Sequence, residues 1–369
     1  MILLALSDVA REVDHAFKII GWICLLLLVG IVIFMLKYTI QYRRSRTPRT
    51  SQIHGHPFLE TMWIVAPTII VIYMFFVGYK GFKMMREVPD NHMVVEVTGK
   101  QWDWSFYYPD FDITTSGRGD ALTLPGGKAV KFLLTSPETD VLHSFYLPDF
   151  RIKEDCVAGR ESYMWLEADM PEPGTKKKYN IFCAEFCGKD HSSMISTMTL
   201  VTPEEFSQWV VDKNEEKNTP IVIEEAMDAS SDLILAENGP VLYKTYCITC
   251  HGPNGRGENE TTTELARDFT SLEKWKQGTK NSDIFRTISN GIPGTQMNAF
   301  PQLSKIQRFA LMHHVADYYK GEHPVDNDDD LASIDEEFHI RNPEPLKDIL
   351  TVEQAMSILA QQDLQSRAE

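Results

Sequence analysis

The sequence predicts a multi-domain protein that combines a hairpin of two transmembrane helices, an all-β sandwich and an all-α domain. Three observations support this fold class: two uncharged apolar runs, a central region of short alternating segments, and a Cys-X-X-Cys-His motif between helical patterns. A chain of 369 residues is expected to form two or three folding units. We divide it into a tail with two membrane helices (1–90), a sandwich (91–212), a linker (213–230), a helical domain (231–322) and an acidic C-terminal tail (323–369).

Two apolar runs near the start of the chain are each long enough to cross a bilayer as a helix. Ile19–Leu36 has eighteen residues without a charge, and Thr61–Tyr79 has nineteen. Met1–Leu6 is shorter than the apolar region of a signal peptide, so we interpret it as a tail that leads to the first helix, with a clipped or atypical signal as the alternative. The loop between the two runs is basic through Lys37, Arg43, Arg44, Arg46 and Arg49. Because positive residues stay on the cytoplasmic side, we expect an inner-membrane protein of a bacterium with its later domains on the periplasmic or outer face.

The region from His92 to Val201 changes to short runs in which apolar and polar residues alternate, such as Met93–Val97 and Val130–Leu134. The sequence Pro125-Gly-Gly127 marks a turn between such runs. Short alternating runs separated by turn residues are typical of an antiparallel β-sandwich.

Sulfur and nitrogen ligands gather near the end of this region. Thiolate and thioether sulfur favour copper, and imidazole suits either of its oxidation states. Two cysteines on one loop can each bridge two copper ions, with one histidine for each ion and two weak axial positions for a thioether and a backbone carbonyl. The candidate ligands are Cys183, Cys187, His143, His191, the Met194 sulfur and the Glu185 carbonyl.

Paired cysteines also form disulfides and zinc sites. A disulfide would leave both histidines and Met194 without a role, and zinc has little use for a thioether. We therefore interpret the cluster as a copper site for electron transfer, in which one electron shared by two bridged ions changes each bond length little.

These residues resemble subunit II of the haem-copper cytochrome c oxidases, which carries a dinuclear copper A centre. The resemblance runs from the first membrane helix to Val201 and includes Gln101-Trp-Asp-Trp104-Ser, Val141-Leu-His143-Ser and the loop Cys183 to Met194. It implies a cupredoxin-like sandwich, with the copper loop between two late strands and His143 at the end of an earlier strand.

The same resemblance implies roles for three further residues. Trp102 would be the residue through which electrons reach the copper centre, and Glu60 would lie at the mouth of a proton pathway into subunit I. The Glu185 carboxylate would hold a magnesium ion at the contact with subunit I. As alternatives, Trp102 belongs to ordinary packing on a strand from Gln101 to Tyr108, and Glu60 is an interfacial carboxylate that reaches water.

A second redox motif is Cys247-Ile-Thr-Cys250-His251, the sequence of c-type haem attachment. Two thiols bond to the vinyl groups of the haem, and the adjacent imidazole binds the iron. A helical pattern over Gly239–Tyr246 leads into the motif and a glycine-rich loop follows it, which argues against a chance match or a redox disulfide.

Met297 is the candidate for the sixth iron ligand, because it lies on a loop downstream of the motif. Met312, His313 and His314 compete for this role, but they fall in an amphipathic pattern over Leu303–Lys320 and are expected to pack against the first helix. The usual class I cytochrome c loop has a proline after the methionine, where this chain has Asn298.

With this domain, the resemblance extends to the caa-type oxidases, in which a class I cytochrome c domain is fused behind the copper domain. It implies the subunit of a respiratory cytochrome-c oxidase that accepts electrons from a cytochrome c donor and its own haem c. Copper A would pass them to subunit I, which reduces oxygen to water and pumps protons, and subunit III would be a further partner. The alternatives are the copper A subunit of a nitric oxide reductase and a membrane-tethered electron carrier.

Composition adds a few limits. The net charge of −16 does not support nucleic-acid binding and suits the attraction of a basic soluble cytochrome. Cys24 and Cys156 are left without a metal or haem and are expected to be inert apolar packing residues. For Cys156, a thiol that mispairs during copper loading and a local adaptation are the alternatives. The acidic run from Asp326 is expected to be solvated or disordered, followed by a short helix at Val352–Leu364.

Overall fold

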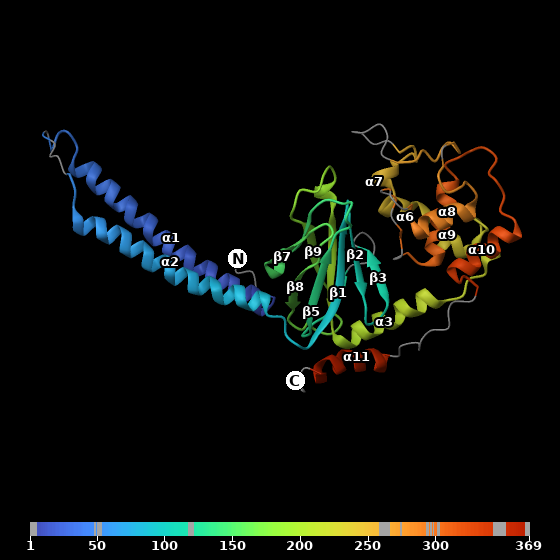
Figure 1. The fold of residues 1–369 in the computed structure, drawn as a ribbon, viewed down its shortest axis with the longest axis horizontal. Helices are drawn as coiled ribbons and strands as arrows, with labels where there is room; N and C mark the ends of the chain where they lie inside the picture. Colours follow the sequence, from blue (N-terminus) through green and yellow to red (C-terminus); the bar gives the residue numbers. More distant parts are fainter. Residues whose placement is uncertain are drawn as a thin grey trace.

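The computed structural model describes residues 6–47, 49, 54–116, 122–257, 266–273, 275–292, 295, 297, 299–300, 303–341 and 352–365. It has three parts: a long arm of two helices, a β-sandwich and a helical domain beside the sandwich (Figure 1). This arrangement confirms the predicted fold class.

The arm is a pair of antiparallel helices, α1 (Asp8–Gln41) and α2 (Pro57–Arg86), which contain the two predicted apolar runs. Ser7 caps α1 through its hydroxyl, and Pro57 stands in the first turn of α2, where its missing N–H costs nothing. Between the helices, Lys80 forms an ion pair with Glu12 at 3.0 Å. The apolar side chains of the arm face outward, as in a helix hairpin surrounded by lipid.

Ion pairs join the start of α1 to the sandwich. Arg151 pairs with Asp14 at 2.7 Å, and Arg11 pairs with Asp169 at 3.0 Å. The N–H of Asp169 also donates to the carbonyl of Leu6 at 3.0 Å. The basic loop lies at the opposite end of the arm, so a cytoplasmic loop puts the sandwich on the outer side (Figure 1).

Two five-stranded sheets form the sandwich, with strand orders β3-β2-β1-β5-β8 and β4-β10-β9-β6-β7. The first sheet contains β1 (His92–Lys100), β2 (Asp103–Tyr108), β3 (Ile113–Ser116), β5 (Ala129–Thr135) and β8 (Ser162–Glu167). The second contains β4 (Leu122–Pro125), β6 (His143–Leu147), β7 (Ile152–Cys156), β9 (Lys177–Cys183) and β10 (Ile195–Val201). The single-turn helix η1 (Pro148–Phe150) follows β6, and a second one, η2 (His191–Ser193), precedes β10.

The prediction of an antiparallel sandwich is wrong for two of the strand pairs, because β1 with β5 and β4 with β10 are parallel. In each pair the partners are separated in the sequence by other strands, so no short hairpin forces them to be antiparallel. The alternation itself is confirmed: Met93, Val95 and Val97 of β1 and Phe132 of β5 are all fully buried between the sheets.

The helical domain contains α4 (Ile223–Ala226), α5 (Asp232–Ala236), α6 (Gly239–Tyr246), α7 (Ile248–His251), α8 (Asn281–Asn290) and α9 (Lys305–Ala316). Helix α6 matches the helix predicted before the Cys-X-X-Cys-His motif, and α9 lies within the predicted Leu303–Lys320. The rings of Phe285 and Phe309 stack with their centroids 4.2 Å apart and join α8 to α9 in the core.

One helix, α3 (Pro203–Asn218), runs out of the sandwich toward the helical domain (Figure 1). A capping box of Thr202 and Glu205 starts it, and Lys217 near its end pairs with Asp112 at 2.5 Å. Beyond it, Ile221 and Ile223 are buried in the core of the helical domain. The segment 213–230, which the sequence analysis set apart as a linker, therefore includes helix and core residues.

The acidic run from Asp326 leads into a packed helix, α10 (Asp328–Phe338), instead of the solvated or disordered surface that we expected. The acids of α10 face cations of the helical domain: Glu337 pairs with Arg286 at 2.7 Å and Asp330 with Lys280 at 2.5 Å. These ion pairs fix the acidic helix α10 against the helical domain, although composition alone predicts a solvated segment.

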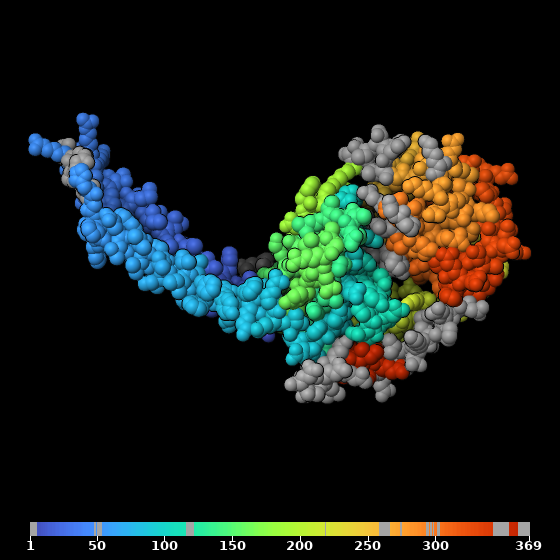
Figure 2. All heavy atoms as spheres, in the orientation of Figure 1, coloured from blue at the N-terminus to red at the C-terminus, as the bar shows by residue number. Residues whose placement is uncertain are grey.

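Helix α11 (Val352–Gln365) matches the predicted Val352–Leu364 helix and packs beneath the sandwich beside α3 (Figures 1 and 2). Ala355 and Leu359 are buried in the sandwich core, and Lys128 donates to the carbonyl of Leu359 at 3.0 Å. The tail therefore contacts both the helical domain and the sandwich.

Candidate metal and haem sites

Three predicted copper ligands converge at one end of the sandwich. The imidazole of His143, at the start of β6, lies with its Nδ1 3.9 Å from the Cys183 sulfur at the end of β9. The sulfurs of Cys183 and Cys187 are 3.8 Å apart. The ligand atoms of these three buried residues all lie within 4.8 Å of one another.

The other predicted ligands surround the same sulfur pair. His191 Nδ1 lies 3.4 Å and the Met194 sulfur 3.9 Å from the Cys187 sulfur. The Glu185 carbonyl lies 3.2 Å from the Cys183 sulfur. All six sequence-predicted ligands therefore meet in space, although His143 comes from another strand.

Local hydrogen bonds shape the loop that carries most of these ligands. Strand pairing sets Cys183 opposite Phe145, and the Ala184 N–H donates to the Ser144 carbonyl at 3.0 Å. The single turn η2 then places His191 and Met194 on the same side, with the Met194 N–H donating to the His191 carbonyl at 3.2 Å.

The charges of the site favour a thiolate–imidazolium pair of Cys183 and His143 when no metal is bound. Burial lowers the pKa of His143, but its contacts with Asp140 and Cys183 outweigh burial and raise the pKa to about 9. Burial raises the pKa of the Cys183 thiol, but hydrogen bonding, chiefly with His143, lowers it overall. The pKa of Cys187 is raised by burial and by the neighbouring Cys183 charge. A bound cation would overcome this mutual repulsion.

The donor set fits copper. Two adjacent thiolates, two imidazoles that both present Nδ1, a thioether and a carbonyl match the soft and borderline ligands that copper prefers. The second ring nitrogen of His143, Nε2, lies 3.4 Å from the Asp140 carboxylate, which can orient the imidazole. Copper bound here would supply a one-electron carrier.

Trp102 lies in the turn between β1 and β2, so the predicted strand from Gln101 is wrong by two residues. Its indole N–H donates to the Cys187 carbonyl at 3.2 Å. Trp104, by contrast, is fully buried in the core and meets the His143 ring edge-on, with the ring centroids 6.3 Å apart. The two tryptophans of one motif therefore have different surroundings, and the first contacts the ligand loop.

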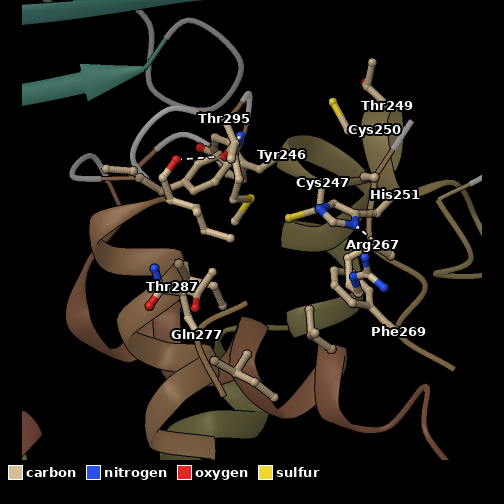
Figure 3. Close-up of a pocket in the computed structure, with 18 of the residues that line it drawn as sticks. Tyr246, Cys247, Thr249, Cys250, His251, Arg267, Phe269, Gln277, Thr287 and Thr295 are labelled. Atoms are coloured by element: carbon tan, nitrogen blue, oxygen red, sulfur yellow. Dashed lines mark hydrogen bonds between the residues drawn. The ribbon is translucent and has the colours of Figure 1, made fainter. Parts of the chain in front are cut away.

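A cavity of about 430 Å³ opens beside the Cys-X-X-Cys-His motif in the helical domain. Cys247 and His251 face it from one side and Thr287 and Gln277 from below (Figure 3). Met297 also lines it. Two attachment thiols, a buried imidazole and a thioether around one mostly apolar cavity fit a covalently bound haem, which would supply a second one-electron carrier.

His251 is held as an iron ligand would be. Its ring stacks on Phe269 with centroids 4.2 Å apart, and Nδ1 lies 3.2 Å from the Arg267 carbonyl (Figure 3). A bond from Nδ1 leaves Nε2 for the metal. Burial lowers the pKa of His251 to about 4, so the ring is neutral at physiological pH, the form that binds iron.

The competing ligands lie elsewhere. Met312 is fully buried in the helix core, and His313 donates or accepts at the Ala226 carbonyl, 2.8 Å away. His314 packs edge-on against Tyr243. None of the three lines the described part of the cavity, as expected. Asn298, which follows Met297, lies outside the described residues.

One side of the cavity beside the Cys-X-X-Cys-His motif is formed by residues of the sandwich. Lys100, Gln101, Trp102, Asp103 and Ser105, from the end of β1 and the start of β2, line it together with the haem-attachment motif. Sequence reasoning missed this shared wall, because it depends on how the two domains pack.

The other predicted residues have simpler surroundings. The Glu60 carboxylate accepts from the His56 N–H at 2.9 Å and so helps to cap α2 at the end of the arm far from the sandwich. Cys24 lies exposed on the arm, while Cys156 is fully buried opposite His143 and burial raises its pKa to about 12. The Glu185 side chain is half-buried.

A membrane hairpin, a sandwich with a Cys/His/Met cluster and a helical domain with a haem-attachment motif together define a membrane-anchored redox protein. Models of known families match the same three parts. The transmembrane domain of cytochrome c oxidase subunit II matches residues 4–80, and its periplasmic domain matches residues 113–201. Subunit III of the cbb3-type cytochrome c oxidases matches residues 235–315.

Relatives match along most of the chain. Cytochrome c oxidase subunit 2 of Alkalihalophilus pseudofirmus is 32% identical over 315 residues, covering 79% of this chain and 84% of the relative. Its counterpart in Bacillus subtilis is 27% identical over 304 residues, covering 75% and 80%. Among solved structures, the periplasmic domain of cytochrome oxidase subunit II of Bradyrhizobium japonicum is 28% identical, covering 34% of this chain and 94% of that domain with a TM-score of 0.30.

The chain belongs to the cytochrome c oxidase subunit II family and carries a cytochrome c domain. It is a membrane protein with an extracellular domain, and it accepts electrons for an oxidase whose catalytic chemistry lies in another subunit. The family implies a subunit I partner, a copper A site and a haem c.

Proposed function

We propose that this chain passes electrons from a cytochrome c donor through its own haem c and Trp102 to dinuclear copper A. One observation supports this path above others: Trp102 lines the cavity of the haem-attachment motif and also donates to the carbonyl of Cys187. A single aromatic side chain therefore spans the distance between the two candidate redox sites.

The proposed copper ligands are those that meet around the sulfur pair: Cys183, Cys187, His143, His191, the Met194 sulfur and the Glu185 carbonyl. The proposed haem c residues are Cys247 and Cys250 for the two thioether bonds, with His251 and Met297 as iron ligands. A methionine ligand raises the haem potential above that of a bis-histidine haem, which suits copper as acceptor.

The electrons then pass to subunit I, which we propose reduces oxygen to water and pumps protons, with subunit III as a further partner in the inner membrane of a bacterium. The Glu185 carboxylate would hold a magnesium ion at the contact with subunit I. The acidic chain, with its net charge of −16, suits a basic cytochrome c as donor on the periplasmic side.

Replacing Trp102 tests the path. In the complex purified from native membranes, Trp102→Leu should slow electron transfer from haem c to copper after rapid photoreduction of the haem, because the side chain that joins the two sites is lost. The absorption spectra of both centres should stay unchanged. Trp209→Leu is the matched control, since Trp209 packs against Tyr108 away from the cavity. An unchanged rate in Trp102→Leu would remove Trp102 from the path.

We also propose that Glu60 lies at the mouth of the proton pathway into subunit I. Because Glu60 is on the cytoplasmic side of the arm, Glu60→Gln should slow turnover while copper and haem spectra are retained. The amide can still accept from the His56 N–H, so the helix cap is kept. Unchanged turnover would leave Glu60 with the capping role alone.

A further inference from the structure

The turn between β1 and β2 contacts both loops that carry the proposed copper ligands, and Gln101 makes both contacts by itself. Its backbone N–H donates to Oδ2 of Asp140 at 2.9 Å. Its side-chain amide donates to the Cys187 carbonyl at 2.8 Å. Gln101 therefore bridges two loops that lie far apart in the sequence.

At the Cys187 end of this bridge, no β6–β9 strand pairing fixes the backbone. Pairing of Phe145 with Cys183 sets the first cysteine relative to His143. Cys187 comes four residues after the end of β9, and its carbonyl instead accepts from two side chains of the turn, Gln101 and Trp102. The position of the second sulfur thus depends on the turn.

Gly188 shows how closely the turn and the loop approach. A Cβ at this residue would lie 3.1 Å from Nε2 of Gln101 and 3.3 Å from the Trp102 ring. Its φ of +116° is also a conformation that only glycine adopts readily. The turn packs against the backbone directly after Cys187, so Cys187 cannot shift toward the turn.

The Asp140 end of the bridge reaches the first histidine. Oδ1 of Asp140 accepts from the Val141 N–H at 2.7 Å and lies 3.4 Å from Nε2 of His143, whose Nδ1 faces Cys183. The Gln101 N–H fixes the other carboxylate oxygen. A carboxylate held at both oxygens can orient an imidazole ligand more strictly than a free one.

We infer that Gln101 is a positioning residue that sets Cys187 against His143, so that both thiolates and both imidazoles meet as the copper pair requires. This rests on the proposed copper site. The amide is neutral and has no aromatic system, so it acts through the two loops and not as part of the electron path. Displacing one bridging sulfur would make the two metal positions unequal.

Hydrogen exchange of the metal-free full-length chain tests this directly. In Gln101→Leu, the amides of His191 and Met194, which bond within the ligand loop, should exchange about fivefold faster, as expected for the loss of one neutral hydrogen bond. Amides of β1 and β5 should keep their protection. Gln208→Leu is the matched control, because Gln208 donates to Asp212 on the exposed face of α3 and should change neither set.

The copper-loaded complex supplies the second readout. Gln101→Leu should change the hyperfine pattern of the paramagnetic resonance spectrum from that of an electron shared equally by two coppers to that of an unequal pair, whereas Gln208→Leu should not. If Gln101→Leu loses protection throughout the sandwich, Gln101→Asn, whose amide is one methylene shorter, replaces it in both measurements. Unchanged loop exchange and an unchanged spectrum would overturn the inference.

The two proposals fail in different ways. A wild-type chain that binds no copper would remove the proposed function, yet the exchange of the metal-free loop would still show whether Gln101 holds it. Conversely, normal copper binding with a loop indifferent to Gln101→Leu would leave the proposed function intact and remove only the positioning role.

Discussion

Adding one methyl group at Gly99 should disturb the candidate copper site through Trp104 and His143, which lie next to this glycine. A Cβ at this β1 residue would lie 2.9 Å from Cζ3 of Trp104 and 3.2 Å from Cβ of His143. Optimal carbon contacts are about 3.5–4.0 Å, so one neighbour must move by about half an ångström. Trp104 is fully buried and packs edge-on against Phe145 at 5.2 Å, which leaves it little room.

The expected cost follows from this crowding. Overpacking a well-filled core costs about 1–3 kcal/mol, or about 4–12 °C in the melting temperature of a domain of this size. Gly99 does not have a positive φ, so backbone strain adds nothing. Because the second contact is with the Cβ of His143, relief of the crowding would also shift this candidate ligand, and we therefore expect the copper spectrum to change as well.

The assay compares Gly99→Ala in two backgrounds, wild type and Trp104→Phe, by amide exchange in β1 and β6 of the full-length chain. The Trp104→Phe background removes the Cζ3 atom that the new methyl group would meet. Gly99→Ala should therefore cost less in that background, by a measurable coupling free energy. Equal costs in the two backgrounds, or no cost in either, would refute the steric reasoning.

Three further predictions test other parts of the structure. Hydrogen bonds from the Asn327 N–H and Lys280 lower the pKa of Asp330, so its stabilisation of α10 is present above the unfolded value near pH 4 and is lost as the pH falls through the lower folded value. The protection of α10 amides, taken relative to the intrinsic exchange rate at each pH, should therefore be weaker at pH 3 than at pH 6, and a smaller change is expected in Asp330→Asn. Cys156→Ser places a hydroxyl in a fully buried site and should lower the free energy of unfolding by about 1–3 kcal/mol while leaving the copper spectrum intact. Loss of that spectrum in folded protein would show that the thiol is not inert. Ending the chain after Arg341 removes α11 and the burial of Leu359, worth about 1.5–3 kcal/mol, so proteolysis within α3 should become faster while the haem spectrum is kept. An unchanged rate would mean that α11 does not stabilise α3.

The ligands were readable in the sequence because their chemistry depends on residue type and spacing. Cys183, Cys187, His191 and Met194 share one loop, and the short helix η2 needs only local hydrogen bonds to bring them together. His143 could be assigned from its chemistry, but its distance from Cys183 depends on the pairing of β6 with β9.

What the sequence could not show depends on contacts between distant segments. Nothing in the run Gln101-Trp102 indicates that it forms a turn against Cys187, since alternating aromatic residues equally suit a strand. A capping box of Asn327 and Asp330 is a local start signal for α10, but the packing of this helix depends on Lys280 and Arg286, which lie far away in the sequence. The parallel strand pairs likewise follow from chain topology and not from alternation.

The measurement that tests the central claim most directly is a reduced-minus-oxidised visible spectrum of the complex purified from native membranes through a tag on this chain. An oxidase subunit predicts the c-type haem band of this chain beside a-type bands from subunit I. A c-type band alone would contradict the claim and indicate a free-standing electron carrier. Bands of b-type and c-type haem without oxygen consumption would contradict it in favour of a nitric oxide reductase.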